Sequence, residues 1–493
     1  MQPDDRAATA ADDGARRRFG YPDWFVTLFL TDIWERFSFY GMAAVLTLYA
    51  ASPAAEGGLG LPPSSAAALF GSYLGLVFLL ALPGGWLGDR VLGTRRATLY
   101  GCVLIAFGHY GMAVPARWTS YLGLVLIAAG TGLLKPNMAA LLSSGYRPEE
   151  HVRRQAAFSI FYVSIQVSAL IAPLVVGALS EILGWHWGFA AAGVGMTFGV
   201  VQFARGSGHF GDRGVAPGHP APVALRQAVG RRTAAFLGVA GVLAAVDVLA
   251  GTFTEMHVIA AIGLCAVVVP FVCFVAVVRD RTLGAAPRRR LLPFFWLLLS
   301  YATFWLLAAQ SGSMLNLFAR EHTARSVAGV VLPASWFQSV IPLFILLTAP
   351  FFAWLWPRLG DRFGVPAKFG LALGFVGAAF IVMSRAAALA VEGPVSPLWL
   401  IAAFLLVACG EVVIGPVGIS TAAEVVDSTR SGRTIGLLWL FSGFGAGLGS
   451  QVVHLSDLWS DRLYYLVLGL FAVGVGIAVV RCRRVLGRVA VTG

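Results

Sequence analysis

Residues 87–93 read Leu-Gly-Asp-Arg-Val-Leu-Gly, and residues 359–364 read Leu-Gly-Asp-Arg-Phe-Gly. Each stretch follows one long apolar run and precedes another, so each is expected to form a short polar loop between two helices. Asp89 and Asp361 are 272 residues apart. A repeated loop at this distance predicts that the chain contains two halves of the same design.

Apolar segments surround both copies of the loop. Hydrophobic residues make up 58% of the 493 residues and charged residues only 12%, and the mean hydropathy is +0.78. Because a soluble chain is about 25% charged, this composition excludes a cytosolic enzyme, a disordered scaffold and a secreted disulfide-linked domain. We therefore expect an all-α polytopic membrane protein.

Fourteen runs have the length of about 20 mostly apolar residues that a transmembrane helix needs. They lie at approximately 24–50, 64–87, 96–114, 120–143, 154–178, 183–203, 232–250, 256–278, 293–319, 334–356, 366–386, 396–420, 433–454 and 461–481. Without the pair at 232–278 they form two sets of six, and each repeated loop follows the second helix of its set. This arrangement resembles the major facilitator fold, in which two six-helix bundles surround a central cavity.

The runs divide the chain into seven segments. We expect a disordered tail at 1–20, an N-terminal six-helix bundle at 21–203, a linker at 204–231, an inserted helix pair at 232–278, a basic linker at 279–292, a C-terminal six-helix bundle at 293–482 and a tail at 483–493.

The basic residues orient these segments. With the N-terminus inside, 29 of the 36 Lys and Arg residues fall on the inner side, five fall on the outer side, and Arg36 and Lys135 lie within helices. Such asymmetry is typical of cytoplasmic loops. We expect a multi-pass protein of the plasma or bacterial inner membrane with both termini in the cytoplasm. The same asymmetry accounts for the net charge of +12 without nucleic acid as a partner.

Motifs for catalysis, metal binding or ATP binding are absent from the sequence. The five cysteines form no C-x-x-C pair, neither lysine completes a phosphate-binding G-x-x-x-x-G-K-[ST] loop, and no H-E-x-x-H occurs. We expect no enzyme activity, no cofactor and no metal. Membrane lipids are the expected surroundings.

Five ionisable residues fall near the middle of apolar runs, namely Asp32, Glu35, Arg36, Lys135 and Glu411. A charge at the bilayer centre costs at least about 2.5–3.5 kcal/mol, so such residues face a partner or an aqueous cavity. The first three share one helix face by their i, i+3 and i+4 spacing. If all five are ionised the set carries one negative charge, which one bound proton neutralises. This arrangement suggests proton coupling, whereas a salt-bridge network that only locks helices together is the alternative.

At these residues the sequence resembles the proton-dependent oligopeptide transporters of the major facilitator superfamily. The resemblance extends from about residue 20 to 480, and an extra helix pair between the halves is found in bacterial members. The family's E-x-x-E-R-F-x-Y-Y-G motif corresponds to residues 32–41 (DIWERFSFYG), G-x-G-x-x-K-P-N to 130–137 (GTGLLKPN), and F-S-I-F-Y to 158–162.

The resemblance implies a role for each site residue. Asp32, Glu35, Arg36 and Lys135 would handle protons, and the last two would receive the carboxylate of a peptide. Tyr40 would donate a hydrogen bond, and Glu411 would bind the peptide's amino group. Side-chain pockets and further contacts would come from Gln166, Trp305, Ile341 and Trp439.

Several site positions depart from the family pattern. The first acid is Asp32 rather than Glu, Gln166 replaces an Asn, Ile341 replaces an amide, and Phe78 replaces a Tyr. The loss of polar groups at the expected amino end of a peptide weakens the case for an ordinary di- or tripeptide.

A further departure affects the outer gate. The family forms a salt bridge between an Arg of the first helix and a Glu of the seventh, but the corresponding residues here are Ala43 and Ala309. Because both partners are missing, no buried charge is orphaned. The outer gate must therefore close through other contacts.

Three functions remain open. The leading one is proton-coupled uptake of di- and tripeptides by alternating access. The second is a proton-coupled carrier of another solute, such as a peptide-like natural product, a drug or an anion, with export as an open direction. The third, a sensor or scaffold that has lost transport, is disfavoured because a scaffold gains little from buried charges.

Overall fold

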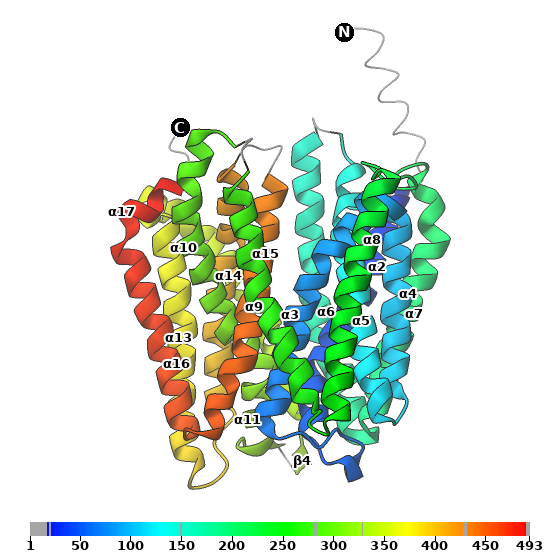
Figure 1. Ribbon diagram of the computed structural model, residues 1–493. Coiled ribbons are helices and arrows are strands. Elements are labelled where there is room, and N and C mark those ends of the chain that lie inside the picture. Colours follow the sequence, from blue (N-terminus) through cyan, green and yellow to red (C-terminus); the bar gives the residue numbers. More distant parts are fainter. Residues whose placement is uncertain are drawn as a thin grey trace.

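The computed structural model describes residues 17–18, 21–147, 150–280, 283–327, 329–426 and 431–489. The tail expected at 1–20 lies outside the described residues except for Arg17–Arg18, and residues 490–493 also lie outside them. The molecule is a bundle of long helices with both ends of the chain on one side (Figure 1). We call this side the terminal end and the other the remote end.

Six long helices form the first half. They are α2 (Asp23–Ala51), α3 (Pro63–Leu87), α4 (Thr94–Ala113), α5 (Arg117–Ser144), α6 (His151–Leu183) and α7 (Trp185–Gly206). Within this half α4 packs against α5 and α7, and α2 packs against α6 and α7.

The second half repeats this plan. Its helices are α10 (Ala285–Ala308) continued by α11 (Met314–Glu321), then α12 (Val340–Leu359), α13 (Val365–Ala390), α14 (Leu398–Glu424), α15 (Ser431–Val452) and α16 (Asp461–Arg481), followed by the short α17 (Arg483–Leu486). Its third long helix, α13, packs against the fourth and the sixth, as α4 does in the first half. The approach is close, since a Cβ at Gly377 of α13 would lie 2.7 Å from the Gly469 carbonyl oxygen of α16. Small residues permit such contacts between membrane helices.

The repeated loops occupy equivalent places in the two halves. The first forms a short turn, η2 (Gly88–Leu92), between α3 and α4, and the second forms η7 (Gly360–Phe363) between α12 and α13. Each therefore joins the second and third helices of its half, as the repeat predicted.

All fourteen apolar runs are helical in the structure. Twelve helices among the described residues are long and apolar enough to cross a membrane, and α2 and α4 carry charged residues that lower their hydropathy. Helices suit this setting because every backbone polar group is satisfied within the segment. The predicted fold class is confirmed, and the chain is a multi-pass membrane protein.

Strands occur only as two-residue pairs in the described part of the chain. Antiparallel β1 (Arg17–Arg18) and β2 (Tyr21–Pro22) precede α2, whereas β3 (Ser326–Val327) and β4 (Val330–Val331) form a small hairpin between α11 and α12. The remaining short turns are η1 (Ala54–Glu56), η4 (Ser207–Phe210), η5 (Ala309–Gly312), η6 (Ala334–Ser339), η9 (Val453–Asp457) and η10 (Gly487–Val489).

The segment between the halves differs from the expected division. The inserted helices are α8 (Val223–Leu249) and α9 (Glu255–Val278), so α8 begins nine residues before the expected 232. α9 packs against both α3 and α15 across the front of the two halves (Figure 1). α8 has no buried residue.

The expected linker at 204–231 is held against the first half rather than free. The backbone N–H of His219 donates to the carbonyl oxygen of Asp89 at 3.1 Å, and Arg95 Nη1 donates to the Gly211 carbonyl oxygen at 3.0 Å. Such contacts between distant segments leave no periodic signal in the sequence, so the sequence did not predict them.

Candidate functional site

A charged cluster lies in the middle of α2. Asp32 and Glu35 are 1% and 0% exposed, and Arg36 Nε is 3.4 Å from both Asp32 Oδ1 and Glu35 Oε2. Helical spacing places the three side chains on one face. The guanidinium group of Arg36 thus forms ion pairs with two carboxylates.

Lys135 completes the cluster from a different helix. It lies on α5, with its Nζ 3.7 Å from Glu35 Oε1 and 3.9 Å from the centre of the Phe39 ring. The aromatic face stabilises a cation that is not held in a tight hydrogen bond. An ammonium on a flexible stem can change partners, so Lys135 is suited to leave Glu35 for another anion.

The two carboxylates differ in their hydrogen bonding. The hydroxyl of Ser164, on α6, donates to Asp32 Oδ2 at 2.5 Å. By contrast, neither oxygen of Glu35 accepts a hydrogen bond from any described residue. Glu35 therefore has free lone pairs, and only the two neighbouring cations balance its charge.

The cluster is electrically neutral and partly accessible. Two carboxylates face two cations, and the side chains of Arg36 and Lys135 keep 17% and 26% of their surface exposed. A solute between the halves can therefore reach both cations, whereas the carboxylates behind them are buried.

Glu411 lies across from this cluster on α14 of the other half. It is within electrostatic range of Tyr40 of α2, Tyr162 of α6 and Tyr301 of α10. No ion pair to Glu411 is found among the described residues. The structure thus brings an unpaired carboxylate of one half and a cation of the other within electrostatic range of the same group, since Tyr40 interacts with both Arg36 and Glu411.

Aromatic side chains from both halves border the space between them. Trp439 of α15 stacks on Phe78 of α3, with ring centroids 6.3 Å apart and planes at 12°. Trp305 of α10 contacts Tyr301, with centroids 6.2 Å apart. These rings are suited to contact apolar parts of a solute.

Two further predicted site residues lie on the helices that form this interface. Gln166, on α6, is 4% exposed and close to Tyr162. Ile341 is the second residue of α12, which packs against α6 and α14. It is half-buried and packs against the hydrophobic core.

The halves are joined at the remote end, where Asn316 Nδ2 of α11 donates a hydrogen bond of 2.7 Å to the Ala44 carbonyl oxygen of α2 (Figure 1). Elsewhere between the halves, Tyr162 and Trp439 each face a partner in the opposite half, yet they expose 44% and 42% of their surface. We therefore describe this conformation as closed at the remote end.

A sequence profile of the POT family matches residues 95–477. The chain belongs to the POT family. It is 37% identical over 449 residues to the peptide transporter YePEPT of Yersinia enterocolitica, covering 88% of this chain and 87% of that protein. It is 32% identical over 473 residues to a di-/tripeptide transporter of Lactococcus lactis subsp. cremoris, covering 93% and 94%.

Solved structures of POT family members superpose closely on this chain. A peptide transporter crystallised with sulfate gives a TM-score of 0.91 at 36% identity, covering 96% of this chain and 97% of that one. A POT family transporter in complex with 5-aminolevulinic acid gives 0.90 at 27% identity, covering 95% and 98%. These matches confirm the resemblance that the sequence motifs indicated. The proteins compared are transporters rather than enzymes.

The sequence analysis did not identify three residues that contact the charged side chains of the site. Ser164 binds Asp32, Phe39 lies under Lys135, and Tyr162 faces Glu411. Phe39 and Tyr162 are inside the quoted motifs, but their letters do not show which side chain they meet. Ser164 is an isolated hydroxyl in an apolar run and gives no signal of its own.

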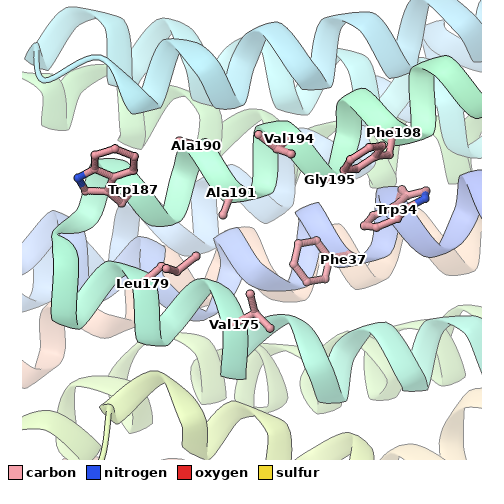
Figure 2. A pocket seen from close by; sticks show the side chains of 10 residues that line it. All are labelled: Trp34, Phe37, Val175, Leu179, Trp187, Ala190, Ala191, Val194, Gly195 and Phe198. Atoms are coloured by element: carbon pink, nitrogen blue, oxygen red, sulfur yellow. The ribbon is translucent and has the colours of Figure 1, made fainter.

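A separate apolar pocket lies on the outside of the first half. Trp34 and Phe37 of α2, Val175 and Leu179 of α6 and Phe198 of α7 border it (Figure 2). Its lining residues carry no charged side chain. We therefore assign it to the membrane-facing side and not to the site for a charged solute.

Proposed function

We propose that this POT family member is a proton-coupled symporter that takes up small peptides by alternating access. The observation that carries this proposal is the opposition of two partly exposed cations, Arg36 and Lys135, to the carboxylate of Glu411, which has no ion pair among the described residues. A peptide is a zwitterion, so these groups fit its carboxylate and its ammonium and set its direction. Arg36 can hold a carboxylate with two parallel hydrogen bonds.

The same groups provide a coupling mechanism. A proton on Glu35 removes the charge that holds Lys135, and Lys135 is then free to bind the peptide carboxylate. Binding of the anion in turn favours a proton on Glu35, because two negative groups next to one ammonium repel each other. Proton and peptide therefore enter together.

Peptide-like solutes are the second candidate, and one observation favours them. Ile341 presents a methyl surface on α12 where the family has an amide, so fewer hydrogen bonds are available to a free ammonium. A solute with a carboxylate and a blocked, displaced or absent amine fits such a site. A POT family transporter has been crystallised in complex with 5-aminolevulinic acid. This complex supports the proposal that the present chain transports small amino acids that are not peptides.

Uptake into proteoliposomes tests the proposal. With an inward proton gradient, labelled dialanine should accumulate and the accumulation should collapse when the gradient is dissipated. Parallel uptake of 5-aminolevulinic acid and an N-acetylated dipeptide separates the two candidates. Equal filling of protein-containing and empty vesicles for all three compounds would reject transport of this solute class.

The topology gives the first prediction. We infer that both termini lie in the cytoplasm of a bacterial cell and that the terminal end is the inner side. In a background without the exposed Cys482, Val391→Cys, 87% exposed at the remote end, should react with an impermeant maleimide in intact cells. Asp212→Cys, exposed in the α7–α8 loop, should react only after permeabilisation. Labelling of Asp212→Cys from outside would reverse the orientation.

A further inference from the structure

The two halves are joined at the remote end by hydrogen bonds from α11 to α2. Asn316 Nδ2 donates to the Ala44 carbonyl oxygen at 2.7 Å, and Arg320 Nη1 donates to the Leu48 carbonyl oxygen at 3.1 Å and to Ser52 Oγ at 3.0 Å. The acceptors follow one face of α2 at i, i+4 and i+8. These contacts hold α11 to α2 without any acid on α2.

A second set of hydrogen bonds between the halves, which we call the second seam, joins η6 of the C-terminal half to α6 of the N-terminal half. Ser339 Oγ donates to the Leu170 carbonyl oxygen at 2.7 Å, and Trp336 Nε1 donates to the Leu174 carbonyl oxygen at 3.0 Å. Here too the acceptors are neutral backbone groups one turn apart.

This second seam ends at the carboxylate of Glu181. Oε2 of Glu181 accepts the backbone N–H of Ala334 at 3.0 Å, and Oε1 accepts both the backbone N–H of Ser335 at 3.0 Å and its hydroxyl at 2.7 Å. Arg325 Nη1 lies 3.6 Å from Oε2. Four groups of one half thus converge on a single acidic side chain of the other half, which is 16% exposed.

Arg325, one of the partners of Glu181, is also held by hydrogen bonds within its own half. Arg325 Nη1 also donates to the Leu332 carbonyl oxygen at 2.7 Å, and the Leu332 N–H donates to the Arg325 carbonyl oxygen at 2.9 Å. The hairpin of β3 and β4 therefore presents Arg325 in a fixed position. Because Arg325 is already positioned to meet Glu181, the contact is strong when the remote end is closed. The same contact is lost completely when the two halves separate.

Gly177 gives an independent sign that this seam is a tight, closed contact. It lies one turn before Glu181 on α6, and a Cβ there would be 2.1 Å from Ser335 Oγ and 2.9 Å from Ser335 Cβ. Since real Cβ atoms do not approach this closely, any larger residue must push η6 away from α6. Only glycine allows Ser335 to reach the Glu181 carboxylate.

We propose that Glu181 is the ionic latch that closes the outer gate, in place of the salt bridge that Ala43 and Ala309 cannot form. The family gate pairs the first and seventh helices, whereas this latch pairs α6 with the hairpin and turn before α12. Its contacts must break each time the remote end opens. The inference rests on the proposed alternating-access cycle.

Distances between spin labels across the gate test the latch directly. Leu183→Cys on α6 and Val330→Cys on β4 are 59% and 64% exposed and lie in opposite halves. In a background without the native cysteines, Glu181→Gln should move the population toward longer label distances. The closed-to-open ratio should fall at least about tenfold, because the Gln side chain has no charge and only one acceptor oxygen, so some of the bonds are lost and the rest become neutral. Gly177→Val should give the same shift through steric contact.

Glu56→Gln is the matched control, because Glu56 borders the same polar pocket as Glu181 but has no ion pair among the described residues. It should leave the distances unchanged. Glu181→Gln should also keep the thermal unfolding midpoint within a few degrees and should change the ratio of outward-facing to inward-facing substrate sites. Restoration of the closed distances by Glu181→Asp would support a role for charge.

Unchanged distances in both Glu181→Gln and Gly177→Val would overturn the latch. A shift of equal size in Glu56→Gln would overturn it as well, since the effect would then belong to pocket charge in general. The distance measurement does not require transport. A protein that shows the shift but no uptake of any tested solute would keep the latch and reject the proposed substrate class.

Discussion

Glu35→Gln is expected to abolish proton-driven accumulation of substrate while leaving exchange across the membrane intact. Gln keeps the shape of the side chain but cannot take up a proton, and it no longer holds Lys135 through charge. Lys135 is then available to the substrate in every state of the cycle. With a membrane potential of 100 mV, one coupled charge provides about 2.3 kcal/mol, or about 50-fold accumulation, and this concentration ratio should fall to unity.

The measurement compares two assays in the same proteoliposomes. Accumulation driven by an inward proton gradient should be lost, whereas counterflow of labelled substrate against unlabelled substrate should persist. Glu424→Gln, the same change at an exposed carboxylate near the end of α14, should leave both intact. If Glu35→Gln still accumulates substrate, Asp32 or Glu411 carries the proton, and Asp32→Asn and Glu411→Gln would then identify which.

Glu35 is the better candidate than Asp32 because of its hydrogen bonding. Asp32 Oδ2 is fixed by its contact with Ser164 Oγ at 2.5 Å. The Glu35 oxygens have only ion pairs at 3.4 and 3.7 Å. A carboxylate with free lone pairs and two movable cations can accept a proton without the loss of a fixed hydrogen bond.

The sequence was sufficient for the helical plan and for the N-terminal part of the site. The spacing of Asp32, Glu35 and Arg36 placed them on one face, and the cost of a charge in a bilayer required that they meet partners. Lys135 was the natural cation for this face. The structure brings these four residues together.

Contacts between distant segments could not be predicted in this way. Glu181 and Ser335 are separated in the chain by α7, the inserted pair, α10 and α11, and nothing in the local sequence of either residue indicates the other. The missing charges at Ala43 and Ala309 showed that a substitute for the gate was needed. These missing charges did not indicate where the substitute gate lies. Many of the hydrogen bonds between the halves end on backbone carbonyl groups of α2 and α6, and every residue type has such a group.

Glu411→Ala is expected to reduce the binding of amine-bearing substrates by more than tenfold. No described residue forms an ion pair with Glu411, and under the proposed function the ammonium of the substrate binds to it. A charge-assisted hydrogen bond contributes about 1.5–3 kcal/mol. Substrates without a charged amine should lose much less affinity.

Ile341→Asn should act in the opposite direction and strengthen the binding of plain dipeptides. It restores an amide to a position where the native residue offers only methyl groups, so a peptide ammonium gains a hydrogen bond that Glu411 alone cannot supply. Native protein should therefore bind plain dipeptides weakly and tolerate modification of the amino end. Ile341→Leu preserves the apolar volume and serves as the control for packing.

Competition by dipeptides and by N-acetylated dipeptides, measured in the native protein and in all three variants, decides between peptide and peptide-like substrates. We expect similar affinities for the two ligands in the native protein and a clear preference for the free amine in Ile341→Asn. Glu411→Ala should weaken the free-amine ligand selectively, since the acetylated ligand has no charge for the carboxylate to bind. Strong binding of plain dipeptides with rejection of acetylated ones by the native protein would contradict this account. The ammonium would then have another ligand, for which Tyr40, Tyr162 and Tyr301 are candidates because each lies within electrostatic range of Glu411, and their substitution would be the next test.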